Sequence, residues 1–95
     1  MNVKMADGSK NLKIALVIPA YNEEKYLASC LSSIKNQDYR GNYEVIVVDN
    51  GSHDRTAEVA RSFGARLISC PQKGVVFARQ KGADLAEADI IVQAD

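Results

Sequence analysis

The sequence predicts a three-layer α/β domain, in which helices cover both faces of a mostly parallel sheet with strand order 3-2-1-4. Short apolar, β-rich runs alternate along the chain with helical patterns, which is the arrangement that builds parallel sheets. The first of these runs is aliphatic without alternation, as expected of a strand buried on both faces. Polar residues gather directly after several of the runs. Right-handed crossovers then favour one half of a doubly wound sheet.

The first half of the chain predicts two strands on either side of one helix. Residues 12–18, LKIALVI, are aliphatic and predict a buried strand. Residues 23–37 predict a helix, because their apolar side chains recur at helical spacing. After the turn DYRGNY, residues 43–49 predict a second buried strand.

The second half repeats the alternation with shorter elements. Residues 55–64 predict a helix that Gly64 closes at its C-terminus. Residues 65–70 predict a short third strand, and the loop PQKG separates it from a third helix over residues 75–88. Residues 89–95 predict the fourth strand, which lies beside the first in the expected strand order.

Length, charge and cysteine content exclude several classes of protein. The 95 residues suffice for one small domain, which we expect over residues 12–95, after a disordered polar leader at residues 1–11. Twelve basic and twelve acidic residues balance, which argues against a nucleic-acid partner held by bulk positive charge. No apolar run approaches the roughly 20 residues needed to cross a bilayer. Cys30 and Cys70 form no CxxC pair, so we expect reduced thiols in a cytoplasmic protein and no zinc site.

Polar residues follow three of the four predicted strands. The first strand leads into PAYNEE, the second into DNGSHD, and the fourth ends at Asp95. Ligands of doubly wound sheets bind beyond the carboxyl ends of the strands, at the point where the winding reverses. The first and fourth strands meet at that point. We therefore expect Tyr21, Asp49 and Asp95 around a common crevice.

The loop after the first strand is unlike a phosphate-binding loop. It contains no glycine and matches neither GxGxxG nor GxxxxGK[ST]. Glu23 and Glu24 at a helix N-terminus suit the helix dipole and repel phosphate, so the loop favours a base or ribose while a cation handles the phosphates. Local chemistry also allows a purely structural interpretation. Asn22 would then cap the first helix, and Ser52 or Asp54 the second.

Three segments together resemble the N-terminal, nucleotide-sugar-binding half of family 2 glycosyltransferases. They are VIPAYNEEKYLASCLSSI, YEVIVVDNGSHDRTAEVA and KGVVFARQKGADLAEADIIVQAD, in the family's order and spacing. The resemblance covers Lys13 to Asp95. It implies a GT-A fold, of which this chain would form the Rossmann-like half.

The resemblance also implies roles for individual residues. Tyr21 would stack on the nucleotide base, Glu23 would accept a ribose hydroxyl, and Asp49 would accept the imide N–H of uracil. Gln80 and His53 depart from the asparagine and threonine that are usual at these family positions. The nucleotide-binding residues implied by the resemblance are Pro19, Ala20, Tyr21, Glu23, Asp49, Gly51, Ser52 and Arg79.

Asp95 matches the first aspartate of the family's DxD motif. In the family this motif binds Mg²⁺ or Mn²⁺, and hard divalent cations prefer carboxylate and phosphate oxygens. The family's second metal carboxylate, acceptor region and general base would all follow Asp95. We therefore expect an inverting transfer from a nucleoside diphosphate sugar, with UDP favoured, to a saccharide or lipid-linked acceptor, and no turnover by these 95 residues alone.

Two other functional classes compete with a transferase. A non-catalytic nucleotide-binding or regulatory module would keep the same pocket. A phosphoacceptor signalling domain would need a lysine at the end of a late strand, and the sequence has none there. We also expect self-association through an exposed sheet edge at residues 89–95. In the full-length protein we expect a cytoplasmic location, peripheral to the cytoplasmic face of a membrane.

Overall fold

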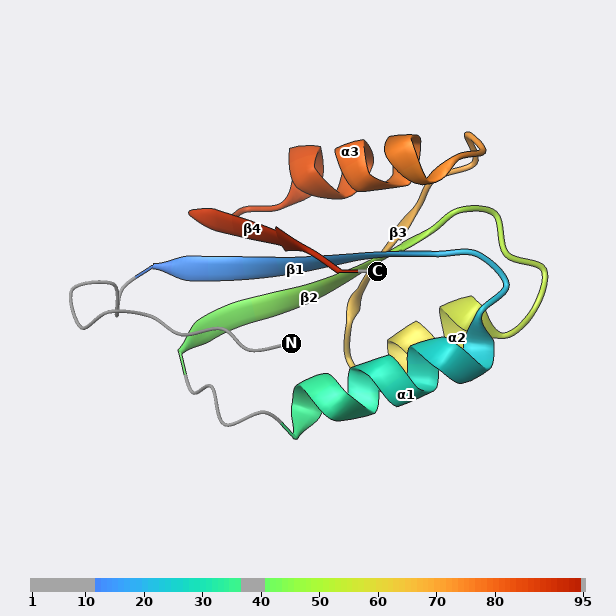
Figure 1. The fold of residues 1–95 in the computed structure, drawn as a ribbon, viewed down its shortest axis with the longest axis horizontal. Helices are drawn as coiled ribbons and strands as arrows, with labels where there is room; N and C mark the ends of the chain where they lie inside the picture. Colours follow the sequence, from blue (N-terminus) through green and yellow to red (C-terminus); the bar gives the residue numbers. More distant parts are fainter. Residues whose placement is uncertain (1–11, 37–40, 95) are drawn as a thin grey trace.

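The computed structural model describes residues 12–36 and 41–94, and the expected leader at residues 1–11 lies outside this part. Four strands and three helices alternate along the described chain, as the sequence predicts (Figure 1). The elements are β1 (Lys13–Ala20), α1 (Glu24–Lys35), β2 (Asn42–Asp49), α2 (Thr56–Ser62), β3 (Arg66–Ser69), α3 (Val75–Leu85) and β4 (Ile90–Gln93).

The sheet has the predicted strand order, β3-β2-β1-β4, and every described pair of strands is parallel. β1 and β2 are paired along their whole length, from Lys13 opposite Asn42 to Ala20 opposite Asp49. β1 therefore lies in the interior of the sheet, and the loops that follow β1 and β2 leave its carboxyl edge together.

Helices cover both faces of the sheet, which confirms the three-layer prediction. α1 and α2 lie on one side and α3 on the other (Figure 1). Alternate residues of β1 supply two separate cores: Ile14, Leu16 and Ile18 belong to the cluster with α1, and Ala15 and Val17 to the cluster with α3. This division explains why β1 is continuously apolar from Ile14 to Ile18, since side chains on both of its faces are removed from water.

Small residues on α3 let this helix approach the sheet closely. Ala78 and Gly82 are the buried residues of the helix. A Cβ atom added at Gly82 would overlap Cγ1 of Val17 and lie 3.0 Å from Cγ2 of Val48. Gly82 is therefore required by packing against β1 and β2, although glycine is a poor residue for a helix interior.

The C-terminal end of α3 differs from the sequence-based expectation, and a long-range hydrogen bond lies at that end. α3 was expected to reach residue 88 but ends at Leu85, whose carbonyl oxygen accepts a hydrogen bond from Nη1 of Arg66 at 2.9 Å. Ala86 is already extended, and the chain then turns into β4. Gly64 follows the C-cap of α2 with φ = 76°, which confirms its predicted role as the closing residue.

Both cysteines are free thiols, as the sequence predicts. Cys30 is half-buried and Cys70 is buried. Burial raises the pKa of the Cys30 thiol.

Within residues 12–36 and 41–94, no helix has the length and apolar character that a bilayer crossing requires.

Candidate functional site

A cavity of about 350 Å³ opens at the carboxyl edge of the sheet. Its walls come from the loops that follow β1, β2 and β3, and from the first residue of α3. The residues that line it are Pro19, Ala20, Tyr21, Glu23, Asn50, Lys73, Gly74 and Val75. The position is the one that the topology predicts for a ligand site.

The structure places half of the predicted nucleotide-binding residues in this lining. Pro19 and Ala20 end β1, and Tyr21 and Glu23 follow in the next loop. The Tyr21 side chain is 46% exposed, so its ring is accessible to a flat ligand. The other predicted residues, Asp49, Gly51, Ser52 and Arg79, are not among those that line the cavity.

Hydrogen bonds join the loop after β1 to the loop after β2. The backbone N–H of Asn22 donates to Oγ of Ser52 at 2.9 Å, and the N–H of His53 donates to Oδ1 of Asn22 at 2.7 Å. Asn22 has φ = 48°, a left-handed conformation that asparagine tolerates better than most residues. The suggestion that Asn22 caps α1 is therefore wrong: its side chain bonds the neighbouring loop, and Glu23 occupies the N-cap position.

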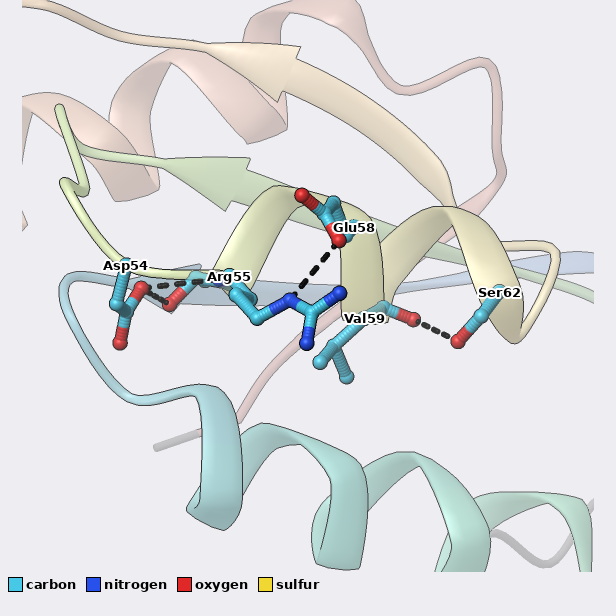
Figure 2. A network of polar contacts seen from close by, with 6 residues as sticks. Asp54, Arg55, Glu58, Val59 and Ser62 are labelled. Carbon is cyan, nitrogen blue, oxygen red and sulfur yellow. Dashed lines mark hydrogen bonds and ion pairs between the residues drawn. The ribbon is translucent and has the colours of Figure 1, made fainter.

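Asp54 connects the N-termini of two helices. Its Oδ1 accepts hydrogen bonds from the backbone N–H and the hydroxyl of Thr56, and its Oδ2 accepts from the N–H of Glu24 at 3.3 Å. Figure 2 shows this carboxylate at the start of α2, with the exposed Arg55–Glu58 ion pair beside it. The hydroxyl of the buried Thr56 in turn accepts from the N–H of Glu23 at 3.1 Å.

These bonds favour the ionised form of Asp54. The Thr56 hydroxyl is the main cause that lowers the pKa of the carboxyl, and the N–H groups of Thr56 and Glu24 act in the same direction. The suggestion that Ser52 or Asp54 occupies the N-cap of α2 is wrong, because Arg55 holds that position; Asp54 instead precedes it and accepts from the N–H of Thr56, the first residue of the helix. The sequence did not indicate that the same carboxylate also serves α1.

Asp49 is half-buried at the end of β2 and shapes the loop that follows. Its Oδ1 accepts from the N–H of Ser52 at 2.9 Å, across Gly51, which has φ = 85°. The turn needs a residue that adopts positive φ without strain, and glycine does. Oδ1 of Asp49 is thus used by the fold, and Asp49 adjoins the lining residue Asn50 at the cavity.

Asn50 and Lys73 line the cavity, and the sequence analysis missed both as site residues. Asn50 is 8% exposed, and its side chain makes three hydrogen bonds to the backbone of residues 70–74. The Asn50-Gly51 pair indicates a turn, but partners 20 to 24 positions away leave no local signal. Lys73 stands in the short loop PQKG, where a cation has no distinctive context.

Arg79 and Asp95 are less closely tied to the cavity. Arg79 is half-buried on α3, about one turn beyond the lining residue Val75. Asp95, the predicted metal ligand, lies outside the described residues. Across the part of the chain that the structure describes, no three His, Cys, Asp or Glu side chains form a group able to hold a metal ion.

The lining combines groups that suit a nucleotide. Tyr21 offers a ring face, Glu23 a carboxylate that can accept from hydroxyl groups, and Lys73 an ammonium that can meet an anion. Pro19 and Val75 add apolar surface. The fold is therefore an α/β domain with a cavity at the carboxyl edge of its 3-2-1-4 parallel sheet, where ligands of doubly wound sheets bind.

The family follows from comparison with known proteins. The sequence matches the family described as Glycosyl transferase family 2 over residues 15–95, and the chain belongs to this family. It is 37% identical over 89 residues to glycosyltransferase AglE of Haloferax volcanii, and this alignment covers 86% of the present chain and 29% of AglE. It is 36% identical over 99 residues to 4,4'-diaponeurosporenoate glycosyltransferase of Staphylococcus haemolyticus, and this alignment covers 97% of the present chain and 26% of that enzyme.

Solved structures agree on the fold. Glucosyl-3-phosphoglycerate synthase from Mycobacterium tuberculosis, in complex with Mn²⁺, UDP and glucosyl-3-phosphoglycerate, superposes with a TM-score of 0.74 at 29% identity. That match covers 92% of this chain and 35% of the synthase. TarS from S. aureus superposes with a TM-score of 0.77 at 26% identity, over 86% of this chain and 27% of that one. The chain thus spans between a quarter and about a third of the proteins it resembles here.

Proposed function

We propose that this chain forms the donor-binding part of a glycosyltransferase. The full protein would transfer a sugar from a nucleoside diphosphate sugar, with UDP favoured, to an acceptor hydroxyl with inversion. The observation that carries the proposal is the cavity, which brings Tyr21 and Glu23 together with Lys73 at the carboxyl edge of a family 2 fold. The UDP complex of the mycobacterial synthase supports uridine as the nucleoside.

Each proposed role follows from the chemistry of the side chain. The Tyr21 ring stacks on the base, and Glu23 accepts a hydrogen bond from a ribose hydroxyl. The Oδ2 atom of Asp49 accepts the imide N–H of uracil, while Oδ1 keeps its bond to Ser52. Gly51 and Ser52 support Asp49, and Arg79 contributes positive charge beside the diphosphate.

We propose that a divalent cation, Mg²⁺ or Mn²⁺, accompanies the donor, with Asp95 as its ligand from this chain. Among the described residues that line the cavity, Glu23 supplies the one carboxylate, which by itself is too few oxygen ligands for such an ion. The site therefore depends on Asp95, on donor phosphates and on residues beyond it. When bound, the cation would neutralise the departing nucleoside diphosphate.

Titration calorimetry on the purified chain tests donor binding. We expect UDP to bind at millimolar or lower concentration and to bind more tightly when Mn²⁺ is present. CDP should bind more weakly, because the N3 atom of cytosine accepts a hydrogen bond where that of uracil donates one. Equal binding of all nucleoside diphosphates would refute the uridine assignment, and no heat from any of them would refute the nucleotide site.

We assign no catalytic residue to this chain. We propose that the general base and the acceptor region of the enzyme lie outside these 95 residues, which cover 29% and 26% of the two relatives named above, so the chain should release no measurable UDP from UDP-glucose. A coupled assay for UDP, with a full-length family member as the positive control, measures this. Sustained turnover by the purified chain would show that the catalytic assignment is wrong.

The acceptor and the cellular site are proposed from the relatives. We propose a saccharide or lipid-linked acceptor, used in the cytoplasm beside the cytoplasmic face of a membrane. One relative from Methanococcus voltae, 31% identical over 87 residues, is named for a dolichyl phosphate-linked substrate. Fractionation of cells that express the full protein would test this location, since recovery only from a non-cytoplasmic compartment would contradict it.

We also propose that the chain self-associates through β4. Among the described strands, β4 pairs with β1 alone, and its Ile90 and Ile91 side chains are exposed. An open strand edge with apolar side chains favours pairing with a second chain. Light scattering during size-exclusion chromatography should give a mass above 10.4 kDa that rises with loading concentration. A constant monomer mass would remove the proposal.

The competing function is a nucleotide-binding module without catalysis. Such a module would keep the cavity and bind UDP equally well. An assay of the full-length protein distinguishes the two functions. An enzyme transfers the sugar of a UDP-sugar to an acceptor or to water in the presence of Mn²⁺, whereas a module binds the UDP-sugar and leaves it intact.

A further inference from the structure

The segment from Cys70 to Gly74 forms one wall of the cavity with little backbone bonding of its own. The last sheet bond before it runs from the N–H of Cys70 to the carbonyl oxygen of Asp49 at 2.8 Å. The first helix bond after it runs from the N–H of Ala78 to the carbonyl oxygen of Gly74. Within the segment, Sγ of Cys70 lies 3.7 Å from the carbonyl oxygen of Gln72, which is a weak contact.

The side chain of Asn50 supplies the missing bonds. Its Nδ2 donates to the carbonyl oxygens of Cys70 at 2.8 Å and Gln72 at 2.6 Å, and its Oδ1 accepts from the N–H of Gly74 at 3.1 Å. Its own backbone N–H donates to the carbonyl oxygen of Ala20 at 2.8 Å. One nearly buried residue therefore joins the loops after β1, β2 and β3 at the cavity.

The chemistry of this contact requires a primary amide. Two donors and one acceptor are used in fixed directions, and only asparagine and glutamine side chains present two N–H donors and an acceptor in one plane. A glutamine would carry the amide one methylene further, into the segment that it holds. A carboxylate would place an oxygen against two carbonyl oxygens.

Lys73 stands between two residues whose backbone is held by Asn50. It supplies the one cation among the described residues that line the cavity. The direction in which Lys73 leaves the chain is set by the peptide groups of Gln72 and Gly74, and both of these bond to Asn50. Fixing the segment thus fixes the origin of the lysine side chain.

We propose that Asn50 is a positioning residue for the donor, which holds residues 70–74 so that Lys73 meets the donor diphosphate. This inference rests on the proposed function, because the diphosphate is the anion that Lys73 would bind. Asn50 acts through Lys73 and Gly74 in this account and has no contact with the reacting atoms.

A double-mutant cycle between Asn50→Ser and Lys73→Gln tests the proposal. The serine removes the amide without adding charge. Each single change should weaken UDP binding by about tenfold, the size expected for one lost charge-assisted contact, and change uridine binding by less than about twofold. The double variant should bind UDP no more weakly than either single variant, because the lysine contributes only when the segment is held.

Matched controls use the same substitutions elsewhere. Asn42→Ser changes an exposed residue at the opposite end of β2, and Lys25→Gln changes an exposed lysine on α1. Both should bind UDP as the unmodified chain does. If Asn50→Ser does not fold, Asn50→Gln replaces it, since glutamine adds no charge and moves the amide by one methylene from the groups that it bonds.

Hydrogen exchange on the ligand-free chain tests the anchor by itself. The Gly74 amide should exchange about tenfold faster in Asn50→Ser than in the unmodified chain, because its acceptor is lost. Additive effects in the cycle, or unchanged UDP binding in Asn50→Ser, would overturn the positioning role while the proposed function stands. Absence of UDP binding in the unmodified chain would refute the proposed function, and Gly74 exchange would still decide whether Asn50 anchors the segment.

Discussion

Single residues at the carboxyl edge divide into those that a ligand can use and those that the fold uses. Tyr21 and Glu23 line the cavity. Asn22 and Ser52 are bonded to one another's loops. Asp49 is used by the fold through the bond from Ser52 to its Oδ1, and it adjoins the lining residue Asn50.

Replacement of Asp49 by asparagine tests its proposed choice of base. The amide oxygen of Asp49→Asn can keep the bond from Ser52, so the loop should fold. The amide nitrogen cannot accept the imide N–H of uracil, and we expect UDP to bind about tenfold more weakly. CDP binding should hold or improve, because the amide can donate to N3 of cytosine.

Calorimetry with both nucleotides measures this change of preference. Asp84→Asn, an exposed residue on α3, is the matched control and should leave both affinities unchanged. A parallel loss for UDP and CDP in Asp49→Asn would assign Asp49 a structural role only.

The stability of the folded chain depends on pH through Asp54. Its pKa in the folded chain is lowered, chiefly by the Thr56 hydroxyl, relative to about 3.9 in an unfolded chain. Its contribution to stability is therefore complete above the unfolded pKa and is lost as pH falls through the folded one.

We expect Asp54→Asn to lower the melting temperature at neutral pH, because an amide cannot accept with both of its ends. The difference from the unmodified chain should shrink as the pH falls below about 4. Thermal melts followed by circular dichroism across this range measure it, with Asp84→Asn as control. A difference that stays constant down to the lowest pH would contradict the ionised bridge between α1 and α2.

Among the elements, α3 has the least room to change. Its buried face consists of Ala78 and Gly82, which lie against β1 and β2. Propensity alone predicts that Gly82→Ala stabilises the helix by up to about 1 kcal/mol. Packing predicts the opposite, because the new methyl group would overlap Val17.

We expect the steric overlap to outweigh the gain in helix propensity, so that Gly82→Ala lowers the free energy of unfolding by about 1–3 kcal/mol. Urea unfolding measures this loss, and Val17→Ala supplies the coupling test. In the Gly82→Ala background, the shortened Val17 side chain should cost less than it does alone. A Gly82→Ala chain as stable as the unmodified one would show that α3 can move away from the sheet.

The strands were predictable because their signal is local. β1 and β2 contain the continuous apolar runs 14–18 and 45–48, and the structure packs residues of both runs into the cores on the two faces of the sheet. The end of α3 was not predictable, since the residues up to Ala88 keep a helical pattern while Arg66 bonds the carbonyl group of Leu85. A contact between positions 19 residues apart overrides local propensity there.

For the molecule as a whole, topology located the site better than residue chemistry did. The strand order places the loops after β1 and β2 together, and four predicted residues, Pro19 to Tyr21 and Glu23, line the cavity there. Asn50 and Lys73 were missed, because their roles depend on a loop that reaches the cavity from β3. Side chain to backbone bonds between distant loops have no periodic signature in a sequence.

The most direct test of the account is an NMR titration of the chain with UDP and Mg²⁺, using Mg²⁺ to avoid paramagnetic broadening. We predict saturable shifts in the backbone amides of Tyr21, Asp49, Asn50 and Gly74, which surround or adjoin the cavity, and little change at the opposite end of the sheet near Lys13 and Asn42. Unshifted amides at millimolar UDP, or shifts confined to residues away from the carboxyl edge, would contradict the claim that this cavity binds a nucleoside diphosphate.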